Sequence, residues 1–322
     1  MDPLSAILLP FEWLVSFVMV AFHEALSFIG LPAASGWTWT ASIIGLVLVI
    51  RAALIPVFVK QIKAQRGMQL LQPDLQKLQA KYKGKTDQLS RQAMAQEQMA
   101  LYKQHGTNPF SACLPMLIQM PFFFGLFRVL SGISNAQANN TGIGAMTHDQ
   151  VEQFHNSSIF GAPLSASLLH GGGGDYQIAV WILSIFMIVA MTASQFITQK
   201  QIMAKNMTEA AMQSPFMKQQ KILLYILPLV FGIGGINFPI GVLIYWTISN
   251  LWTMGQQFYV IRRMPAPGSP AAKELNARRA AKGLAPIDVT TGKVVKPEDM
   301  PPPPPPKVQR EQPQRKNRKK KS

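Results

Sequence analysis

The chain has 322 residues, of which 48% are hydrophobic and only 14% charged, an apolar content that is rich for a soluble protein. It contains one cysteine, which excludes an internal disulfide framework and any metal site built from several cysteines. A net charge of +16 is also found in nucleic-acid-binding proteins, but here the basic residues gather in three segments that alternate with apolar runs. This alternation is typical of a protein that crosses a membrane several times.

The first apolar segment, residues 11–30, also carries two glutamates and a histidine. We predict that it forms an amphipathic helix at the outer membrane interface, within an exported N-terminal region of residues 1–36. Trp13 and the charged side chains suit the level of the headgroups, and no basic residue precedes the segment to hold it in the cytoplasm. A membrane span is the alternative that the sequence leaves open.

Residues 37–59 form an apolar run with a single charged side chain, Arg51. The run is long enough to cross a bilayer, which takes about 20 helical residues. An arginine near the middle of a span costs at least about 2.5–3.5 kcal/mol, so it normally faces protein or water and serves a function. The run contains no Asp or Glu to neutralise it. We interpret Arg51 as a functional group; the alternative is a structural cation that pairs with a carbonyl oxygen or an acid of another span.

The next segment, residues 60–107, is polar and holds nine basic residues. Apolar residues recur at helical spacing in residues 68–82 and more loosely in residues 89–102, on either side of a turn at residues 83–87. The pattern predicts a helical hairpin with its basic residues on the solvent side.

Four more spans are predicted downstream. The second and third span are residues 108–131 and 176–197, and the apolar block 221–261 is long enough for a hairpin of two more. The break in that block should fall at residues 234–239 (GGINFP), because glycine and proline end helices. The fourth span is then about 15 residues or ~22 Å long. Because that is short against a ~30 Å hydrocarbon core, local thinning of the bilayer is expected.

The placement of charge predicts the topology. Twenty-nine of the 31 basic residues lie between Lys60 and Lys103, between Lys200 and Lys221, or between Arg262 and Lys321. The segment 131–175 contains none. By the positive-inside rule, the three basic segments, including the loop 198–220, are cytoplasmic and the loop 132–175 is exported. Five spans then place the N-terminus outside and the C-terminus inside.

Residues 262–322 differ from the rest in composition. They hold sixteen basic against five acidic residues and the run Pro301–Pro306. Such a segment buries too little apolar surface to fold alone, so we predict a disordered cytoplasmic tail, with a short helix near residues 271–282 as an option. The sequence leaves three interpretations of the basic end open. It is a solvated arm, it binds ribosomal RNA through counter-ion release, or it binds anionic lipid headgroups.

Three segments are distinctive in combination. They are VIRAALIPVFVKQIKAQRGMQLLQPDLQKLQAKYK, EQMALYKQHGTNPFSACLPMLIQMPFFFGLFRVL and INFPIGVLIYWTISNLWTMGQQFYV. Together they resemble the YidC family of membrane protein insertases, over roughly residues 37–131 and 176–261. The likeness is to the compact five-span bacterial form. It implies an all-α polytopic membrane protein: a five-helix transmembrane bundle with a cytoplasmic helical hairpin and a disordered basic tail, in the bacterial cell membrane.

The resemblance implies an insertase and chaperone rather than an enzyme. In this family a transmembrane arginine lies in a polar groove that is open to the cytoplasm and to lipid but closed on the outer side, and its place in the motif makes it Arg51 here. That charge would attract the acidic exported segment of a nascent membrane protein, whose apolar helix then moves into lipid. The chain has no GxxxxGK[ST] motif, and its five histidines lack ligand spacing, so we expect no nucleotide, metal or other cofactor.

Other polar or amphipathic side chains at membrane depth are further candidates for the groove. They are Gln119, Thr192, Gln195, Trp246 and Asn250. Trp246, in LIYW, matches a groove tryptophan of the family, whereas the choice between Gln195 and Gln199 stays open. For the isolated polar side chains, hydrogen bonding between helices is an equal alternative. Arg128, near the exported end of its span, is interpreted as structural, with its side chain reaching the interface.

The implied partners are nascent membrane-protein clients, membrane lipids, the ribosome, and the Sec translocon where the protein does not act alone. We favour the ribosome for the basic end of the tail, because an insertase gains by docking near the exit tunnel. The candidate contacts are Arg315, Lys316, Arg318, Lys319, Lys320 and Lys321.

Two rival functions remain to be weighed. A solute transporter or channel would use Arg51 as a counter-charge for its substrate, and it should show internal repeats or paired broken helices. A lipid-modifying enzyme would need His, Asp or Ser clustered near one membrane face. The spans here are unequal, the hairpin has no counterpart, and no such cluster occurs, so we predict an insertase.

Overall fold

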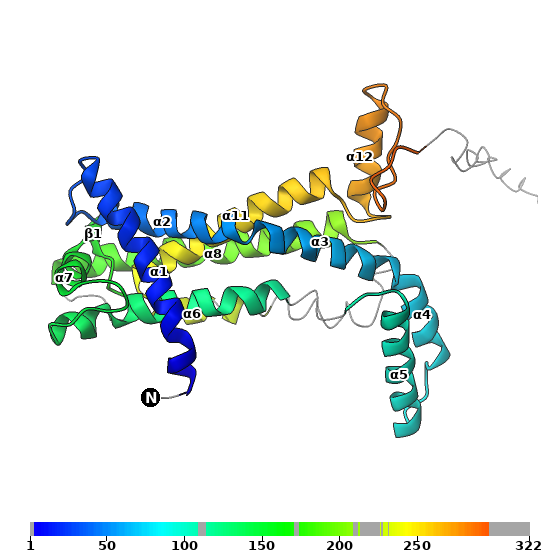
Figure 1. Ribbon diagram of the computed structural model, residues 1–322, viewed down its shortest axis with the longest axis horizontal. Helices are drawn as coiled ribbons and strands as arrows, with labels where there is room; N and C mark the ends of the chain where they lie inside the picture. The colour runs from blue at the N-terminus through cyan, green and yellow to red at the C-terminus, as the bar shows by residue number, and fades with distance from the viewer. Residues whose placement is uncertain are drawn as a thin grey trace, which may run out of the picture.

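The computed structural model describes residues 3–108, 114–170, 174–208, 212, 226, 228–230 and 232–295, and these are mainly helical (Figure 1). The elements are α1 (Pro3–Phe28), α2 (Gly36–Ala53), α3 (Ile55–Leu70), α4 (Gln72–Lys81), α5 (Gln88–Gln104), α6 (Leu114–Ala138), α7 (His148–Asn156), β1 (Ser158–Ile159), β2 (Ala162–Pro163), η2 (Gly174–Tyr176), α8 (Gln177–Asn206), η3 (Gly235–Asn237), α11 (Ile240–Arg263) and α12 (Pro270–Ala280). The only sheet in this part of the chain is the antiparallel pair β1–β2. The predicted all-α class is confirmed.

Four of the described helices are long and apolar enough to cross a membrane: α2, α6, α8 and, beyond the predicted set, α1. The first three correspond to predicted spans. α11 runs alongside α2 and α8 at the position of the fifth span, with a less apolar sequence. In the predicted fourth span, a short apolar helix covers Pro228–Asn237. Most of the remaining residues of that span lie outside the described residues. Exposed apolar side chains along α8, such as Ile182 and Phe186, form the surface that a lipid-facing helix presents.

α1 is longer than the interfacial helix expected at residues 11–30. It packs on both α2 and α6, yet it crosses them steeply instead of running with them (Figure 1). Its Glu12 carboxylate is buried and lies 2.9 Å from Nε of Arg128. Arg128 therefore makes an ion pair with α1, where we expected it only to reach the interface. The crossing direction suits a helix at the interface, while its length also suits a span, so the interfacial location stays a prediction.

The predicted first span, residues 37–59, is two helices. α2 ends at Ala53 and α3 begins at Ile55, because Pro56 has no N–H to donate to the carbonyl of Ala52. The Leu54 N–H still donates to the Ile50 carbonyl at 3.1 Å. As a consequence Arg51 lies in the last turn of α2, where we had expected the middle of one continuous span.

Two other helices extend beyond their expected ends. α6 continues past residue 131 to Ala138, because Ile133 and Ala136 are buried against the core. α8 continues past residue 197 to Asn206, into the segment expected to be a loop. The predicted break at residues 234–239 corresponds to the short 3-10 helix η3 and the residues that follow it. The α-helix α11 starts directly after Pro239.

α4 and α5 lie side by side as a hairpin that projects from one end of the bundle (Figure 1). Leu71, Leu75 and Tyr102 form a small buried cluster between its arms. Lys81 donates to Glu97 across the hairpin at 2.6 and 2.8 Å, and Asp87 caps α5 by accepting from the Ser90 N–H. The cytoplasmic location of this hairpin stays a prediction.

The C-terminal segment differs from the expected disorder over residues 262–295. α12 forms close to the optional helix at residues 271–282, capped by the Ser269 hydroxyl, which accepts from the Ala272 N–H. Ala271 and Ala272 are buried, α12 packs on α8, and Lys205 forms an ion pair with Glu274. Small apolar side chains on an existing helical surface were enough to order this segment. Residues 296–322, including the candidate ribosome contacts, lie outside the described residues.

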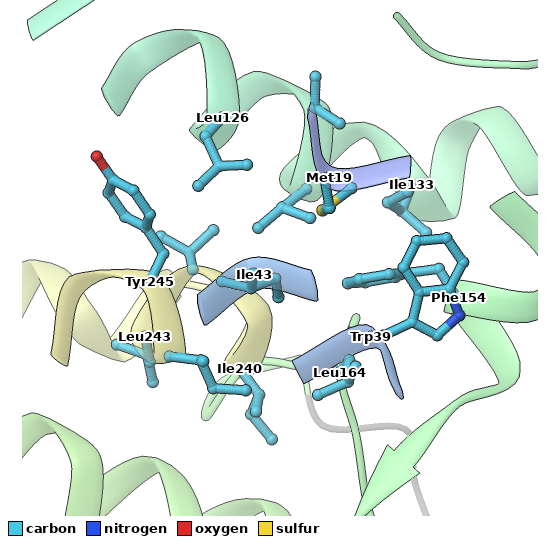
Figure 2. Packing of buried hydrophobic residues seen from close by; sticks show 14 of the residues in the cluster. Met19, Trp39, Ile43, Leu126, Ile133, Phe154, Leu164, Ile240, Leu243 and Tyr245 are labelled. Atoms are coloured by element: carbon cyan, nitrogen blue, oxygen red, sulfur yellow. The ribbon is translucent and has the colours of Figure 1, made fainter. Parts of the chain in front are cut away.

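The main core gathers side chains from α1, α2, α6, α7 and α11, and from the segment after β2 (Figure 2). Trp39 and Phe154 are fully buried in it and meet edge to face, with ring centroids 5.2 Å apart. The loop also binds the start of α11, since the N–H groups of Ile240 and Gly241 donate to the carbonyls of Ala166 and Leu164, each at 2.9 Å. These contacts satisfy helix donors that lack a partner within the helix. The segment of residues 139–170 thus packs against one end of the bundle.

Candidate functional site

Arg51 lies half-buried between α2 and α11. Its Nη2 donates to the Ser249 hydroxyl at 2.7 Å and to the Ser249 carbonyl at 3.3 Å. The guanidinium carbon lies 5.9 Å from the centre of the Phe58 ring. Within the described part of the chain, no carboxylate lies within ion-pair distance of Arg51. Arg51 thus does bond to a carbonyl oxygen of another helix, as the structural alternative predicted. Its positive charge has no ionic partner among the described residues.

The local sequence explains this position. The break before Pro56 ends α2 and places Arg51 in its last turn. Backbone carbonyls at a helix C-terminus lack intrahelical partners and carry the negative end of the helix dipole, which favours a cation. The following Ala52 and Ala53 are exposed and too small to cover the guanidinium. A long cationic side chain is thus tolerated in an apolar run because its head meets polar backbone and the Ser249 hydroxyl.

Gln119 on α6 belongs to the same polar layer. Its Nε2 donates to the Tyr245 hydroxyl at 2.8 Å. Tyr245 is only 3% exposed, and Figure 2 shows its hydroxyl pointing away from the apolar core. Tyr245 and Ser249 are one turn apart on α11 and so share a helix face. We call Arg51, Gln119, Tyr245 and Ser249 the polar cluster.

Sequence reasoning missed two members of this cluster, Tyr245 and Ser249. A signal was present, because the segment LIYWTISN places two hydroxyl side chains four residues apart in an apolar helix. Such a pair marks a polar face. It does not reveal which other helices that face meets.

The remaining predicted polar residues lie on another side of α11. Asn250 Nδ2 donates to the Met191 carbonyl of α8 at 3.4 Å. The Thr192 hydroxyl and Gln195 Oε1 are buried, with no hydrogen-bond partner among the described residues. Thr192 also lines an otherwise apolar cavity of about 560 Å³ with Gly232 and Ile233. Of the predicted groove residues, Arg51 and Gln119 thus belong to the polar cluster, whereas Asn250, Thr192 and Gln195 lie at α8; the choice between Gln195 and Gln199 stays open.

Trp246 takes a third position, between α6 and the turn before α11. Its ring packs edge to face on Phe123, with centroids 4.9 Å apart, and stacks on Phe238 at 5.6 Å. The side chain is only partly buried in this aromatic group. Trp246 directly follows Tyr245 in the sequence and therefore lies next to the polar cluster.

The described residues contain no group of three or more His, Cys, Asp or Glu that could hold a metal ion. The polar cluster and the side chains around it offer charge, hydrogen bonds and apolar contact. Such a site can bind a segment of polypeptide and release it without a covalent step.

Comparison with known proteins gives a consistent relationship. The family model "60Kd inner membrane protein" matches residues 31–267. A "Membrane protein insertase YidC" of Streptomyces avermitilis is 47% identical over 262 residues, which are 80% of this chain and 59% of that protein. The protein of the same name from Tropheryma whipplei is 42% identical over 284 residues, covering 86% of this chain and 90% of the relative.

Among solved structures, an "Active YidC insertase crystal structure with the first transmembrane domain resolved" aligns with a TM-score of 0.43 at 23% identity, over 77% of this chain and 45% of that one. This chain also spans less than two thirds of the Streptomyces relative. The sequence relationships cover most of the chain, however, and with its apolar helices they identify a multi-pass bacterial membrane protein that belongs to the 60Kd inner membrane protein family, the family of the YidC insertases.

Proposed function

We propose that this protein is a membrane protein insertase and chaperone. It receives nascent membrane proteins beside the polar cluster and releases their helices into the bilayer, alone or with the Sec translocon. Arg51 supplies the charge, while Gln119 and Asn250 offer hydrogen bonds to the backbone or side chains of a client. Trp246, Thr192 and Gln195 line the path on either side of α11. The relatives reported above carry the insertase name, and the transporter alternative has no matching observation.

The observation that carries this proposal is the environment of Arg51. Its guanidinium is held by the neutral oxygens of Ser249, with no acid beside it among the described residues. An uncompensated cation in apolar surroundings attracts an anion strongly, because two charges 4 Å apart interact by about 4 kcal/mol at an effective dielectric constant of 20. An acidic client segment would satisfy that charge. Its apolar helix would then partition into lipid, with no nucleotide required.

The packed segment of residues 139–170 supports the proposed direction of entry. Phe154 and Leu164 of this segment are fully buried, and its carbonyls bind the start of α11. A client would therefore enter from the opposite end, where the hairpin α4–α5 projects. With the positive-inside rule, this gives an exported N-terminus, a cytoplasmic hairpin and a cytoplasmic C-terminus.

The test is insertion of a single-span client with an acidic exported segment into proteoliposomes that hold purified protein. We expect Arg51→Ala to lower insertion at least about tenfold, which corresponds to ~1.4 kcal/mol, and Arg51→Lys to restore most of it. Lys273→Ala is the matched control, because this exposed cation on α12 has no hydrogen-bond partner among the described residues. Unimpaired insertion by a folded Arg51→Ala protein would overturn the role of the charge.

A second arm changes the client. Neutralising its acidic segment should reduce insertion by the wild-type protein and have little further effect on Arg51→Ala. Equal sensitivity of both proteins would show that the client's acids act elsewhere. Running the assay with and without reconstituted Sec translocon separates independent from assisted insertion.

We also propose that Arg315, Lys316, Arg318, Lys319, Lys320 and Lys321 bind the ribosome. Six cations at the end of a proline-rich arm suit phosphate-backbone contacts that weaken with salt. Because α12 packs on α8, the deletion that tests this should begin after residue 295 and spare the folded segment. Binding to purified ribosomes over a salt titration should weaken in the deleted protein; equal binding would exclude the tail as the contact.

A further inference from the structure

We propose that a pocket beside α12 binds the phosphate group of an anionic phospholipid. The pocket has a volume of about 450 Å³. Five cationic side chains line it: Arg262, Arg263, Arg278, Arg279 and Lys282. We call it the basic pocket. It lies apart from the polar cluster and from the basic end of the tail, and it does not depend on the proposed insertase function.

The position of the pocket favours a lipid. Arg262 and Arg263 form the last turn of α11, which runs alongside the membrane-spanning helices α2 and α8. α12 lies crosswise to these helices at the end of the bundle (Figure 1). A helix that is crosswise to a membrane bundle follows the membrane surface, so the pocket sits where α11 leaves the bilayer. That is the level of the phosphate groups.

The lining of the pocket is built for an anion. No carboxylate lines it, and Glu274, an acid of α12 that interacts with Arg278, forms an ion pair with Lys205. Five like charges around one cavity repel each other unless an anion joins them. Arginine is suited to this role, because its planar fork of donors matches the oxygens of a phosphate.

The two arginines of α12 are held in place by backbone carbonyls. Arg278 Nη2 donates to the Arg262 carbonyl at 3.1 Å and its Nε to the Glu274 carbonyl at 3.3 Å. Arg279 Nε donates to the Ala285 carbonyl at 2.9 Å. Both side chains are half-buried. Backbone bonds fix these guanidinium groups while their charge and their other donors stay available to a ligand.

The apolar part of the lining separates a lipid from a nucleic acid. Leu275 and Leu284 line the pocket together with the cations, and Leu284 is 50% exposed. These side chains suit the glycerol and upper acyl chain of a phospholipid. A single-stranded nucleic acid would instead use aromatic side chains for base stacking, and the pocket lining contains none.

The test uses the full-length protein in a nonionic detergent and native mass spectrometry to count bound lipids during titration with phosphatidylglycerol or phosphatidylcholine. The variant is Arg263→Gln with Lys282→Gln. Neither side chain makes a hydrogen bond to the described residues, so their loss leaves the bonds of α12 intact. The matched control, Arg318→Gln with Lys319→Gln, removes the same charge from the tail. Lys282→Glu is a second, single variant on an exposed residue after α12.

We expect the tightest phosphatidylglycerol site to weaken at least about tenfold in the pocket variant and in Lys282→Glu, because each lowers the charge of the pocket by two. The tail control should keep wild-type affinity, and phosphatidylcholine should bind weakly to every form. Equal affinity of pocket variant and tail control would overturn the proposal, and so would equal binding of the two lipids. Competition by inorganic phosphate at the lipid's own concentration would assign the pocket to free phosphate. Pocket-dependent binding of an RNA oligonucleotide without lipid binding would assign it to nucleic acid.

Discussion

Arg51 and Ser249 are 198 residues apart in the chain, yet Nη2 of Arg51 lies 2.7 Å from the Ser249 hydroxyl. This contact joins the end of α2 to the middle of α11. The Ser249 hydroxyl and carbonyl accept hydrogen bonds from the half-buried guanidinium. Because both acceptors are neutral, the positive charge of Arg51 remains. The same serine thus orients the cation without cancelling the charge that we propose clients detect.

Replacing this serine should separate stability from charge. We expect Ser249→Ala to destabilise the protein by about 1–2 kcal/mol, because a hydrogen bond to a charged group is lost while the bond to the backbone carbonyl remains. Thermal unfolding in detergent measures the change. Insertion should fall less than in Arg51→Ala, since the cation is still present.

Ser184→Ala is the matched control for that experiment. The Ser184 hydroxyl on α8 is fully buried and has no hydrogen-bond partner among the described residues. Its removal should leave stability unchanged or slightly raised. A destabilisation equal to that of Ser249→Ala would mean that the Arg51 contact adds nothing specific.

The bond between Gln119 and Tyr245 should appear as a coupling energy. In a double-mutant cycle of Gln119→Leu and Tyr245→Phe, we expect about 0.6 kcal/mol and at most ~1.7 kcal/mol, the range for hydrogen bonds between membrane helices. Unfolding free energies of the four proteins give this value. Tyr259→Phe replaces Tyr245→Phe in the control cycle, because Tyr259 is 60% exposed on the same helix. A coupling of zero in the first cycle, or the same coupling in both, would contradict the contact.

Gly45 should be required for the packing of α1 on α2. A Cβ at this position would lie 2.6 Å from the Phe22 ring of α1. We expect Gly45→Ala to cost about 1–3 kcal/mol through overpacking, and Phe22→Ala to recover part of that loss in the double variant. Gly255→Ala on α11 meets nothing within 4 Å and should be neutral or stabilising by up to ~1 kcal/mol. Equal stability of the two alanine variants would argue against the close approach of α1.

The hairpin α4–α5 should lose protection in acid. The hydrogen bonds from Lys81 and Tyr82 lower the pKa of Glu97 below its ordinary value of 4.5. Because the folded-state pKa is the lower one, the contribution of Glu97 is complete above pH ~4.5 and disappears as the pH falls through the lowered pKa. Amide hydrogen exchange should therefore be faster in Glu97→Gln than in wild type at pH 7. The two proteins should converge in more acidic buffer.

Glu152→Gln is the control for the hairpin, because Glu152 is an exposed carboxylate on α7 without a hydrogen bond to the described residues. It should leave exchange in α4 and α5 unchanged at every pH. A constant difference between Glu97→Gln and wild type down to strong acid would show that charge is not the cause.

Much of the fold follows from sequence pattern alone. Apolar runs of spanning length predicted α2, α6 and α8, and the GGINFP segment preceded the start of α11. Helical spacing and a polar turn predicted two helices near α4 and α5. These features depend on local chemistry: the cost of exposing backbone to lipid and the inability of proline to donate. The sequence offered the helix α12 only as an option within a disordered tail, because its alanines are buried against a surface of α8 that the local sequence does not reveal.

The sequence by itself determined that a cation sits in an apolar helix without an acid nearby, which is a matter of residue type and spacing. Only the tertiary structure decided that Ser249 holds Arg51, that Tyr245 holds Gln119, and that Asn250 faces α8 instead. These pairings depend on how α11 is rotated between α2, α6 and α8. That rotation is set by the packing of side chains 59 to 198 residues apart, and no local pattern encodes it.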